Sequence, residues 1–273
     1  MTFPSLGIIG CGNMAAAILQ NALSTRLLPA QAVTVSDRDC SKAEDFAKRF
    51  GTCVAPANID TVTASELILF AVKPQDAATV LASLAPAFAK TRKIALSIIA
   101  GLSLERMEAL LGKTTPIVRV MPNTPIQTGE GASVYTTNAA CTAAEAAQVA
   151  ALFQSGGICL SAPENYFDAV TALSGSGPAY VFLFMEALAD AARSIGLPDS
   201  LGIPLVLQTL KGAVKLVEES GEPPNVLREK VTSKGGTTAA ALAVLEKNNL
   251  RDLIKHAIQA ASERSKELSR GIE

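Results

Sequence analysis

The stretch Gly7-Ile8-Ile9-Gly10-Cys11-Gly12-Asn13-Met14-Ala15 decides the fold. It joins a short apolar run to an alanine-rich segment with the composition of a helix. Between a strand and a helix, Gly10 permits a tight turn, Gly12 lets the backbone approach a pyrophosphate, and Ala15 lets the helix pack on the strand. The alternative is a glycine-rich turn that binds nothing, but this placement favours a dinucleotide at the helix N-terminus.

Apolar runs alternate with amphipathic segments from this motif outward, which is typical of a parallel sheet covered by helices. Strands are predicted at residues 6–9, 33–36, 67–72, 94–98 and 117–120, with a weaker pair at 133–135 and 158–160. Beyond residue 163 only helices are predicted, at 179–195, 199–219, 224–231, 237–247 and 250–268. The predicted fold is α/β, with a Rossmann-type parallel-sheet domain at residues 1–163 and an all-helical domain at residues 164–273.

The chain is apolar for a water-soluble protein, with 49% hydrophobic and 18% charged residues. It contains no continuous apolar run of the ~18 residues that a membrane span needs. The predicted helix at residues 179–195 is apolar around most of its circumference, so we expect it to be buried on most sides. We therefore expect the chain to form at least a dimer through its helical half.

Charge and residue usage exclude several classes of function. The net charge is −1 and the basic residues are not clustered, so neither nucleic acid nor a membrane surface is an expected partner. The five cysteines have no metal-ligand spacing, and His256 is the sole histidine, so metal and Ser-His-Asp chemistry are not expected. Residues 1–6 lack a basic segment, and with scattered thiols this predicts a cytoplasmic protein without a signal peptide.

The end of the second strand, Val35-Ser36-Asp37-Arg38, bears on the choice of cofactor. An acidic residue here would bind the ribose 2′-hydroxyl of NAD, whereas a hydroxyl with an arginine would bind the 2′-phosphate of NADP. Both patterns are present. We favour NADPH on Ser36 and Arg38, with NADH as the weaker alternative.

Further segments follow strand ends and should face the ligand crevice, because ligands bind outside the carboxyl ends of parallel strands. They are Ala71-Val72-Lys73-Pro74, residues 98–101 and residues 119–125. Because residues 119–125 contain two prolines, this segment could instead be a stiff loop with a structural role.

Two loops in the helical half, residues 173–180 and 231–238, place glycines and hydroxyls at helix N-termini. Such termini attract anions such as carboxylates, although Ser and Thr also cap helices routinely. Residues 162–210 contain neither Lys nor His, the usual acids for carbonyl reduction. A protonated imine needs no strong acid, so the residues favour C=N over C=O reduction.

Taken together, these motifs resemble the pyrroline-5-carboxylate reductase family over essentially the whole chain. The resemblance rests on residues 10–15, 71–74, 121–125, 174–180 and above all 232–238 with Leu242. It implies NADPH-dependent reduction of L-1-pyrroline-5-carboxylate to L-proline, and a homo-oligomer formed by a helical dimerisation domain. It also implies that the cofactor contacts Ile9, Gly10, Cys11, Gly12, Asn13, Met14, Ser36, Arg38, Asn58, Ala71, Val72, Lys73, Pro74, Ile98, Ile99 and Ala100.

For the substrate, the resemblance implies a carboxylate site at Ser233, Gly236 and Thr237, with Glu164 at the pocket edge. Thr238 would contact the ring nitrogen as the catalytic residue, directly or through a water. Lys234 and Lys230 depart from residues frequent in the family, which affects the stiffness and polarity of this loop. Two alternatives stay open: a related imine or β-hydroxyacid-type reductase, and a non-catalytic NADP-binding regulator.

Overall fold

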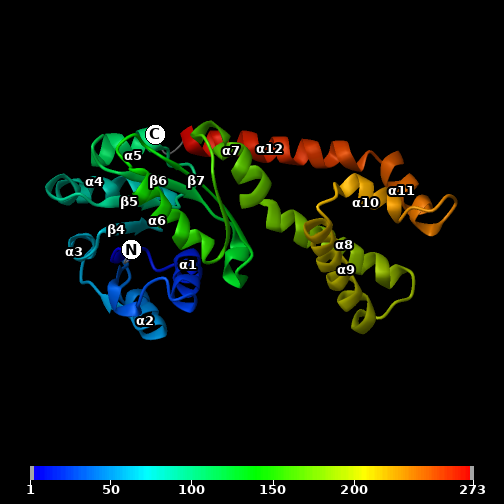
Figure 1. The fold of residues 1–273 in the computed structure, drawn as a ribbon, viewed down its shortest axis with the longest axis horizontal. Coiled ribbons are helices and arrows are strands. Elements are labelled where there is room, and N and C mark those ends of the chain that lie inside the picture. Colours follow the sequence, from blue (N-terminus) through cyan, green and yellow to red (C-terminus); the bar gives the residue numbers. More distant parts are fainter. Residues whose placement is uncertain (1–2, 271–273) are drawn as a thin grey trace. The chain divides into compact units, whose positions relative to one another are not determined.

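The computed structural model describes residues 3–270 and divides into two compact units. The first unit comprises the residues up to Ser176 together with those from Ala261 onward, and the second comprises Gly177–Ala260. Figure 1 shows the sheet-containing first unit and the helical second unit. We describe each unit by itself.

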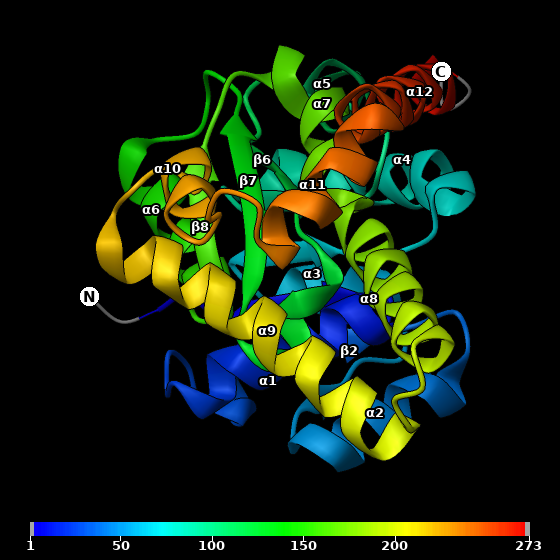
Figure 2. The same cartoon turned by 90° about the vertical axis from the view of Figure 1, so that its right-hand side faces the viewer.

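The first unit is built on an eight-stranded sheet with the order β3-β2-β1-β4-β5-β6-β7-β8. Neighbouring strands are parallel except for β6 and β7, which lie side by side in Figures 1 and 2 and are antiparallel. Strand order reverses between β1 and β4, the point at which doubly wound sheets bind ligands. The strands are β1 (Leu6–Ile9), β2 (Val33–Ser36), β3 (Cys53–Val54), β4 (Leu67–Phe70), β5 (Ile94–Ser97), β6 (Ile117–Met121), β7 (Gly131–Thr137) and β8 (Gly157–Ser161).

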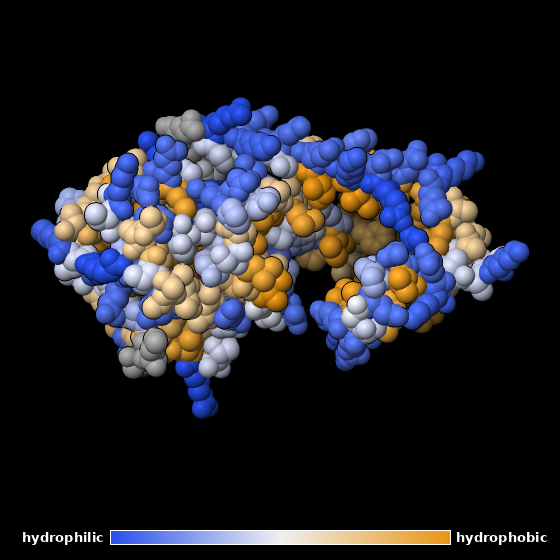
Figure 3. Space-filling view, turned by 45° about the horizontal axis from the view of Figure 1, so that its top comes forward, coloured by the Kyte–Doolittle hydropathy of each residue, from blue (hydrophilic) through white to orange (hydrophobic). Residues whose placement is uncertain are grey.

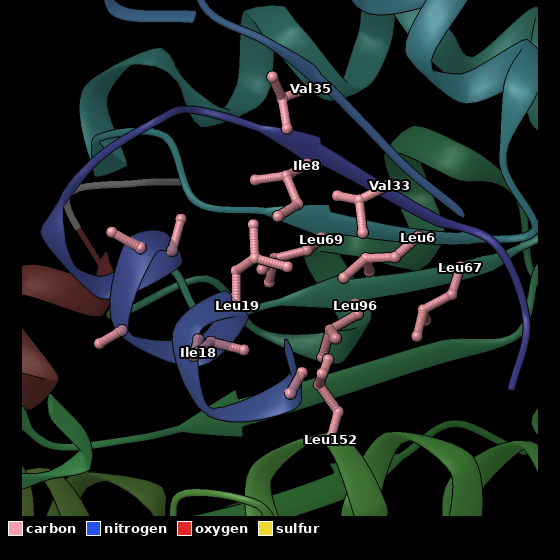
Figure 4. Close-up of a cluster of buried hydrophobic side chains, with 14 of the residues drawn as sticks. Leu6, Ile8, Ile18, Leu19, Val33, Val35, Leu67, Leu69, Leu96 and Leu152 are labelled. Carbon is pink, nitrogen blue, oxygen red and sulfur yellow. The ribbon is translucent and has the colours of Figure 1, made fainter. Parts of the chain in front are cut away.

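Helices cover both faces of this sheet, as the predicted α/β fold requires. One core cluster joins the strands to α1 (Asn13–Ser24), α2 (Cys40–Phe50) and α6 (Ala143–Gln154). The other joins them to α3 (Asn58–Ala64), α4 (Pro74–Lys90) and α5 (Leu104–Leu111). Figure 4 shows how Ile8 and Leu69 of the sheet point toward Leu19 of α1. Successive strand residues alternate between the faces, so Ile8 belongs to the first cluster and Ile9 to the second.

The local start signals in the sequence correspond to structural caps. Ser103 accepts a hydrogen bond from the Arg106 amide and caps α5, where an acidic residue stands in the first turn. Thr142 and Glu145 form the predicted capping box at the start of α6. These caps fix the connections that follow β5 and β7.

The second unit contains α8 (Gly177–Ser194), α9 (Asp199–Ser220), α10 (Pro224–Lys230), α11 (Thr237–Lys247) and the first half of α12 (Leu250–Arg270). The prediction that residues 179–195 are buried on most sides does not hold within one chain. No residue of α8 is buried, and Leu183 is 65% exposed. Within this unit, the main packing partner of α8 is α9. The rest of the apolar surface of α8 therefore stays uncovered. Figure 3 shows hydrophobic residues, in orange, at the surface of the helical unit.

Helix α9 is long and apolar enough to cross a membrane by length and composition, among the described residues. A single helix that passes this test is weak evidence for a membrane span. Most of α9 is exposed beside α8, and a protein partner would cover the same apolar surface.

The compact units divide at Ser176, whereas the predicted domain boundary falls at residue 163. Residues 164–176 stay with the sheet because their polar groups bond to it. Glu164 pairs with Arg119 of β6, and the Asn123 side-chain amide donates to the Ser174 carbonyl at 3.0 Å. The segment ends in a π-helical turn, Thr171–Gly175. It also includes the short helix α7 (Phe167–Val170), whose Asp168 accepts a hydrogen bond from Ser265 of α12.

Candidate dinucleotide-binding cleft and substrate loop

The first unit contains a cleft of about 740 Å³ at the carboxyl ends of β1, β2 and β4. It therefore lies at the reversal of strand order, where the sequence predicts a dinucleotide. Its lining includes many of the predicted cofactor residues: Ile9, Gly10, Cys11, Gly12, Asn13, Arg38, Asn58, Ala71, Val72 and Lys73. It also includes Asp37, the acidic residue on which the NAD alternative rests, and residues that the sequence did not indicate: Ala16, Lys42, Asp45, Phe46, Arg49, Asp76, Thr79 and Val80.

The glycine-rich turn has the shape that a pyrophosphate needs. Gly10 has a φ of +101°, and a Cβ there would lie 2.7 Å from the Ala71 carbonyl oxygen, so only glycine fits between β1 and β4. A Cβ on Gly12 would meet no atom within 4 Å and would project into open space. Helix α1 begins at Asn13 with no side-chain cap and no acidic residue in its first turn. Its free amides and open approach fit a bound phosphate group.

The end of β2 differs from the prediction for Ser36. Ser36 is only 2% exposed, and its hydroxyl donates a 2.8 Å hydrogen bond to the Asn58 side-chain oxygen. It does not line the cleft, because its side chain is buried against Asn58 of α3. Asn58 does line the cleft, so Ser36 contacts the cleft wall through Asn58.

Asp37 organises the glycine-rich loop. One carboxylate oxygen accepts the Cys11 amide at 2.8 Å, and the other accepts the Asp39 amide at 3.0 Å. Burial, and secondly the charge of Asp37, raise the pKa of the Cys11 thiol from 9.0 to about 12. Cys11 is therefore a neutral wall of the cleft and no nucleophile at neutral pH.

Besides Ser36, five of the predicted cofactor residues lie outside the cleft lining. Ile99 is 4% exposed and Met14 packs partly against the first core cluster, so both support the neighbouring backbone. Pro74 is the first residue of α4, and its ring sets the path that follows Lys73. Ile98 and Ala100 follow β5, the strand next to β4. The five residues are Met14, Pro74, Ile98, Ile99 and Ala100.

The predicted substrate loop connects α10 to α11 in the second unit. The Gly236 amide donates to the Ser233 carbonyl at 3.1 Å, which closes a tight turn. Gly236 is the N-cap of α11, which has no side-chain cap and no acidic residue in its first turn. A Cβ on Gly236 would overlap the Ser233 hydroxyl, so glycine lets that hydroxyl lie against the helix start. Ser233 and Thr237 thus lie beside uncapped amides at a helix start, where free amides favour an anion.

Thr238 lies in the first turn of α11 and is partly exposed. It does not cap this helix, because the cap position belongs to Gly236. Lys234 is exposed, and Lys230 is paired with Glu222, so neither rigidifies the turn at Gly236. Within this unit, the Thr238 hydroxyl is therefore accessible to a ligand.

Glu164 belongs to the first unit, whereas the predicted substrate loop belongs to the second. One of its carboxylate oxygens accepts from the Arg119 guanidinium at 2.7 Å and from the Leu104 amide at 2.8 Å. Arg119 also lies over the Phe167 ring, 4.7 Å from its centroid. Glu164 thus joins the start of α5, β6 and the segment before α8.

Comparison with known proteins assigns the chain to a family. A reductase from Arabidopsis thaliana named pyrroline-5-carboxylate reductase is 40% identical over 97% of this chain and 95% of its own length. The chain belongs to the pyrroline-5-carboxylate reductase family. A pyrroline-5-carboxylate reductase from Synechocystis is 41% identical, over 97% of this chain and 98% of that protein. The sequence profile for pyrroline-5-carboxylate reductase dimerisation matches residues 164–268, and that for an NADP oxidoreductase, coenzyme F420-dependent, matches residues 5–101.

Solved structures of pyrroline-5-carboxylate reductases share the fold of the whole chain. The enzyme from Coxiella burnetii is 33% identical with a TM-score of 0.91, over 97% of this chain and 98% of that chain. The Plasmodium falciparum enzyme, solved with NADP bound, is 33% identical with a TM-score of 0.87, over 98% of this chain and 99% of that chain.

Proposed function

We propose that this protein reduces the C=N bond of L-1-pyrroline-5-carboxylate to L-proline with NADPH, the last step of proline biosynthesis. The observation that carries this proposal is full-length identity of about 40% to reductases named for this substrate. The cleft at the β1–β4 reversal and the uncapped start of α11 supply an anion-binding surface for each reactant.

NADPH is the proposed cofactor, with NADH as a weaker one. When bound, it supplies the hydride that is added to the imine carbon. The free amides at the start of α1 would hold its pyrophosphate, and Arg38 would supply positive charge to its ribose end. A relative solved with NADP bound supports this choice.

The substrate is proposed to bind the loop before α11. Ser233, the Gly236 backbone and Thr237 bind the carboxylate, and the Thr238 hydroxyl holds a proton at the ring nitrogen, directly or through a water. Because the imine is already cationic when protonated, the chain needs to position it and to exclude water rather than to supply a strong acid. Glu164 is proposed to border the substrate site, in addition to holding Arg119.

The protein is proposed to be a cytoplasmic homo-oligomer whose helical units form the dimer, with no nucleic-acid or membrane partner. The exposed apolar side chains of α8 and α9, such as Phe182 and Leu205, need a cover in water. A family profile described as a dimerisation region matches this half of the chain. The net charge of −1 supplies no attraction to polyanions.

The deciding experiment is an assay of NADPH oxidation that depends on pyrroline-5-carboxylate, with proline identified as the product. A related imine or β-hydroxyacid-type reductase would oxidise NADPH only with other imines or with oxoacids. A non-catalytic regulator would bind NADPH without any turnover. Either result would overturn the proposed function.

A further inference from the structure

The structure leaves the recognition of a 2′-phosphate without its expected hydroxyl. Ser36 is buried and donates its hydroxyl to Asn58. Asp37 uses both carboxylate oxygens on backbone amides. Two anionic oxygens therefore lie near the end of β2, and any phosphate there needs a cation to balance them.

Helix α2 turns one face toward the cleft. Lys42, Asp45, Phe46 and Arg49 are spaced by three or four residues, as one side of a helix requires, and all four line the cleft. Lys42 stands in the first turn of α2, next to the loop that follows β2. Helical side chains lean toward the N-terminus, so the Lys42 stem leans toward that loop, whereas Arg49 stands about two turns further along.

The cations of the cleft differ in what they already bind. Arg38 forms an ion pair with Asp76 at 3.6 Å. Arg49 lies over the Phe50 ring, 4.7 Å from its centroid. Within residues 3–270, no carboxylate oxygen lies within 4.0 Å of the Lys42 ammonium. Lys42 is thus a cation of the cleft wall that forms no ion pair within this distance in the described residues, although its charge also acts on the neighbouring Asp39 carboxylate.

We propose that Lys42 is the residue that selects NADP(H) over NAD(H), by pairing with the 2′-phosphate beside Arg38. Ser36 then acts only through Asn58, as a positioning residue. This inference rests on the proposed function, because it requires that the cleft bind a dinucleotide. It deepens that function by naming a specificity-determining residue that the β2 motif does not contain.

The test is equilibrium binding of NADP⁺ and NAD⁺ by titration calorimetry, since the chain contains no tryptophan for quenching. Lys42→Gln should raise the Kd for NADP⁺ about tenfold or more and change that for NAD⁺ by less than about twofold. Lys90→Gln is the control. It removes the same charge at the last residue of α4, far from the cleft lining, and should leave both dissociation constants unchanged. Ser36→Ala should lower the melting temperature but keep the ratio of the two constants.

The possible results separate the two proposals. Wild-type protein that binds neither dinucleotide would refute the proposed function itself. Wild-type protein that prefers NADP⁺, with the preference intact in Lys42→Gln, would refute the role of Lys42 alone. Loss of the preference in Ser36→Ala or in Arg49→Gln, but not in Lys42→Gln, would overturn it too and assign the phosphate to that residue.

Discussion

Gly10 and Gly12 stand two residues apart and serve different needs, which single substitutions can separate. Gly10→Ala would force a Cβ against the Ala71 carbonyl at a φ of +101°, so it should cost more than about 2 kcal/mol of unfolding free energy. Gly12→Ala has room and an ordinary φ of −86°, so it should fold normally. Its methyl group projects into the cleft, and we expect weaker NADPH binding. Urea unfolding and calorimetry measure the two effects, and similar stability losses would contradict this division.

The partly buried thiol of Cys11 should make the stability of the protein depend on pH. Folding raises its pKa from 9.0 to about 12, so the folded state favours the thiol. Its contribution to stability is complete below about pH 9 and is lost as the pH rises toward 12. At pH 8, iodoacetamide should modify the exposed Cys40 and Cys53 much faster than Cys11. Mass spectrometry of tryptic peptides reads out each site, and equal rates at Cys11 and Cys40 would show that the thiol is not held neutral.

Thr238 tests the proposed chemistry. Removing its hydroxyl from the imine nitrogen should lower kcat/KM about 5–150-fold, with NADPH affinity unchanged. Because Gly236 rather than Thr238 caps α11, Thr238→Ala should change the unfolding free energy by less than about 0.5 kcal/mol. Thr237→Ala keeps the backbone amide and should be milder. Normal turnover together with a lowered melting temperature in Thr238→Ala would remove it from the mechanism.

Among single residues, the sequence predicts those that act through their backbone conformation. It misses those that reach the cleft only through the tertiary fold. Gly10 and Gly12 are recognisable because a fixed turn requires them at fixed spacing. Lys42 and Asp76 reach the cleft from helices, and no local motif marks them. The i, i+3, i+7 spacing of Lys42, Asp45 and Arg49 is the one signal that could have indicated a shared face.

Among the elements, the continuous apolar strands are predictable from the sequence, whereas the edge strand β3 is not. Strands such as β4 are continuous apolar runs because both of their faces are buried. Strand β3 has two exposed residues and exists through its hydrogen bonds to β2, so it lacks a pattern of its own. The π-helical turn at Thr171–Gly175 likewise depends on tertiary bonds such as that from Asn123 to Ser174.

The Glu164–Arg119 ion pair connects the segment before α8 to β6, and its loss should destabilise the first unit. The Arg119 side chain is only 10% exposed, so Glu164→Gln should leave an uncompensated charge and cost about 3 kcal/mol in urea unfolding. Glu222→Gln removes the carboxylate of a pair whose lysine is 60% exposed and should cost less than about 1 kcal/mol. Equal losses in the two variants would show that the Arg119 pair is not structurally important. A raised KM of Glu164→Gln, measured where the variant is still folded, would support Glu164 at the substrate site.

For the whole molecule, the uncovered apolar surface of α8 predicts association. Light scattering at micromolar concentration should return at least twice the 28.3 kDa chain mass. Leu183→Glu, at a side chain that is 65% exposed, should shift the protein toward monomer. Val54→Glu places the same charge on the exposed strand β3 of the first unit and should leave the mass unchanged. A monomeric wild-type protein would contradict the proposed dimer.

Helix α12 begins in the second unit and ends in the first, where Ser265 donates to Asp168 across 97 positions of sequence. During synthesis, the chain emerges from the ribosome in order, and domains generally fold as they emerge. The sheet can pair once β8 has been made, but the half of α12 that joins this unit follows only after the entire helical insertion. The nascent first unit must therefore wait, with the Asp168 side of α7 uncovered, until residues beyond Ala260 are translated.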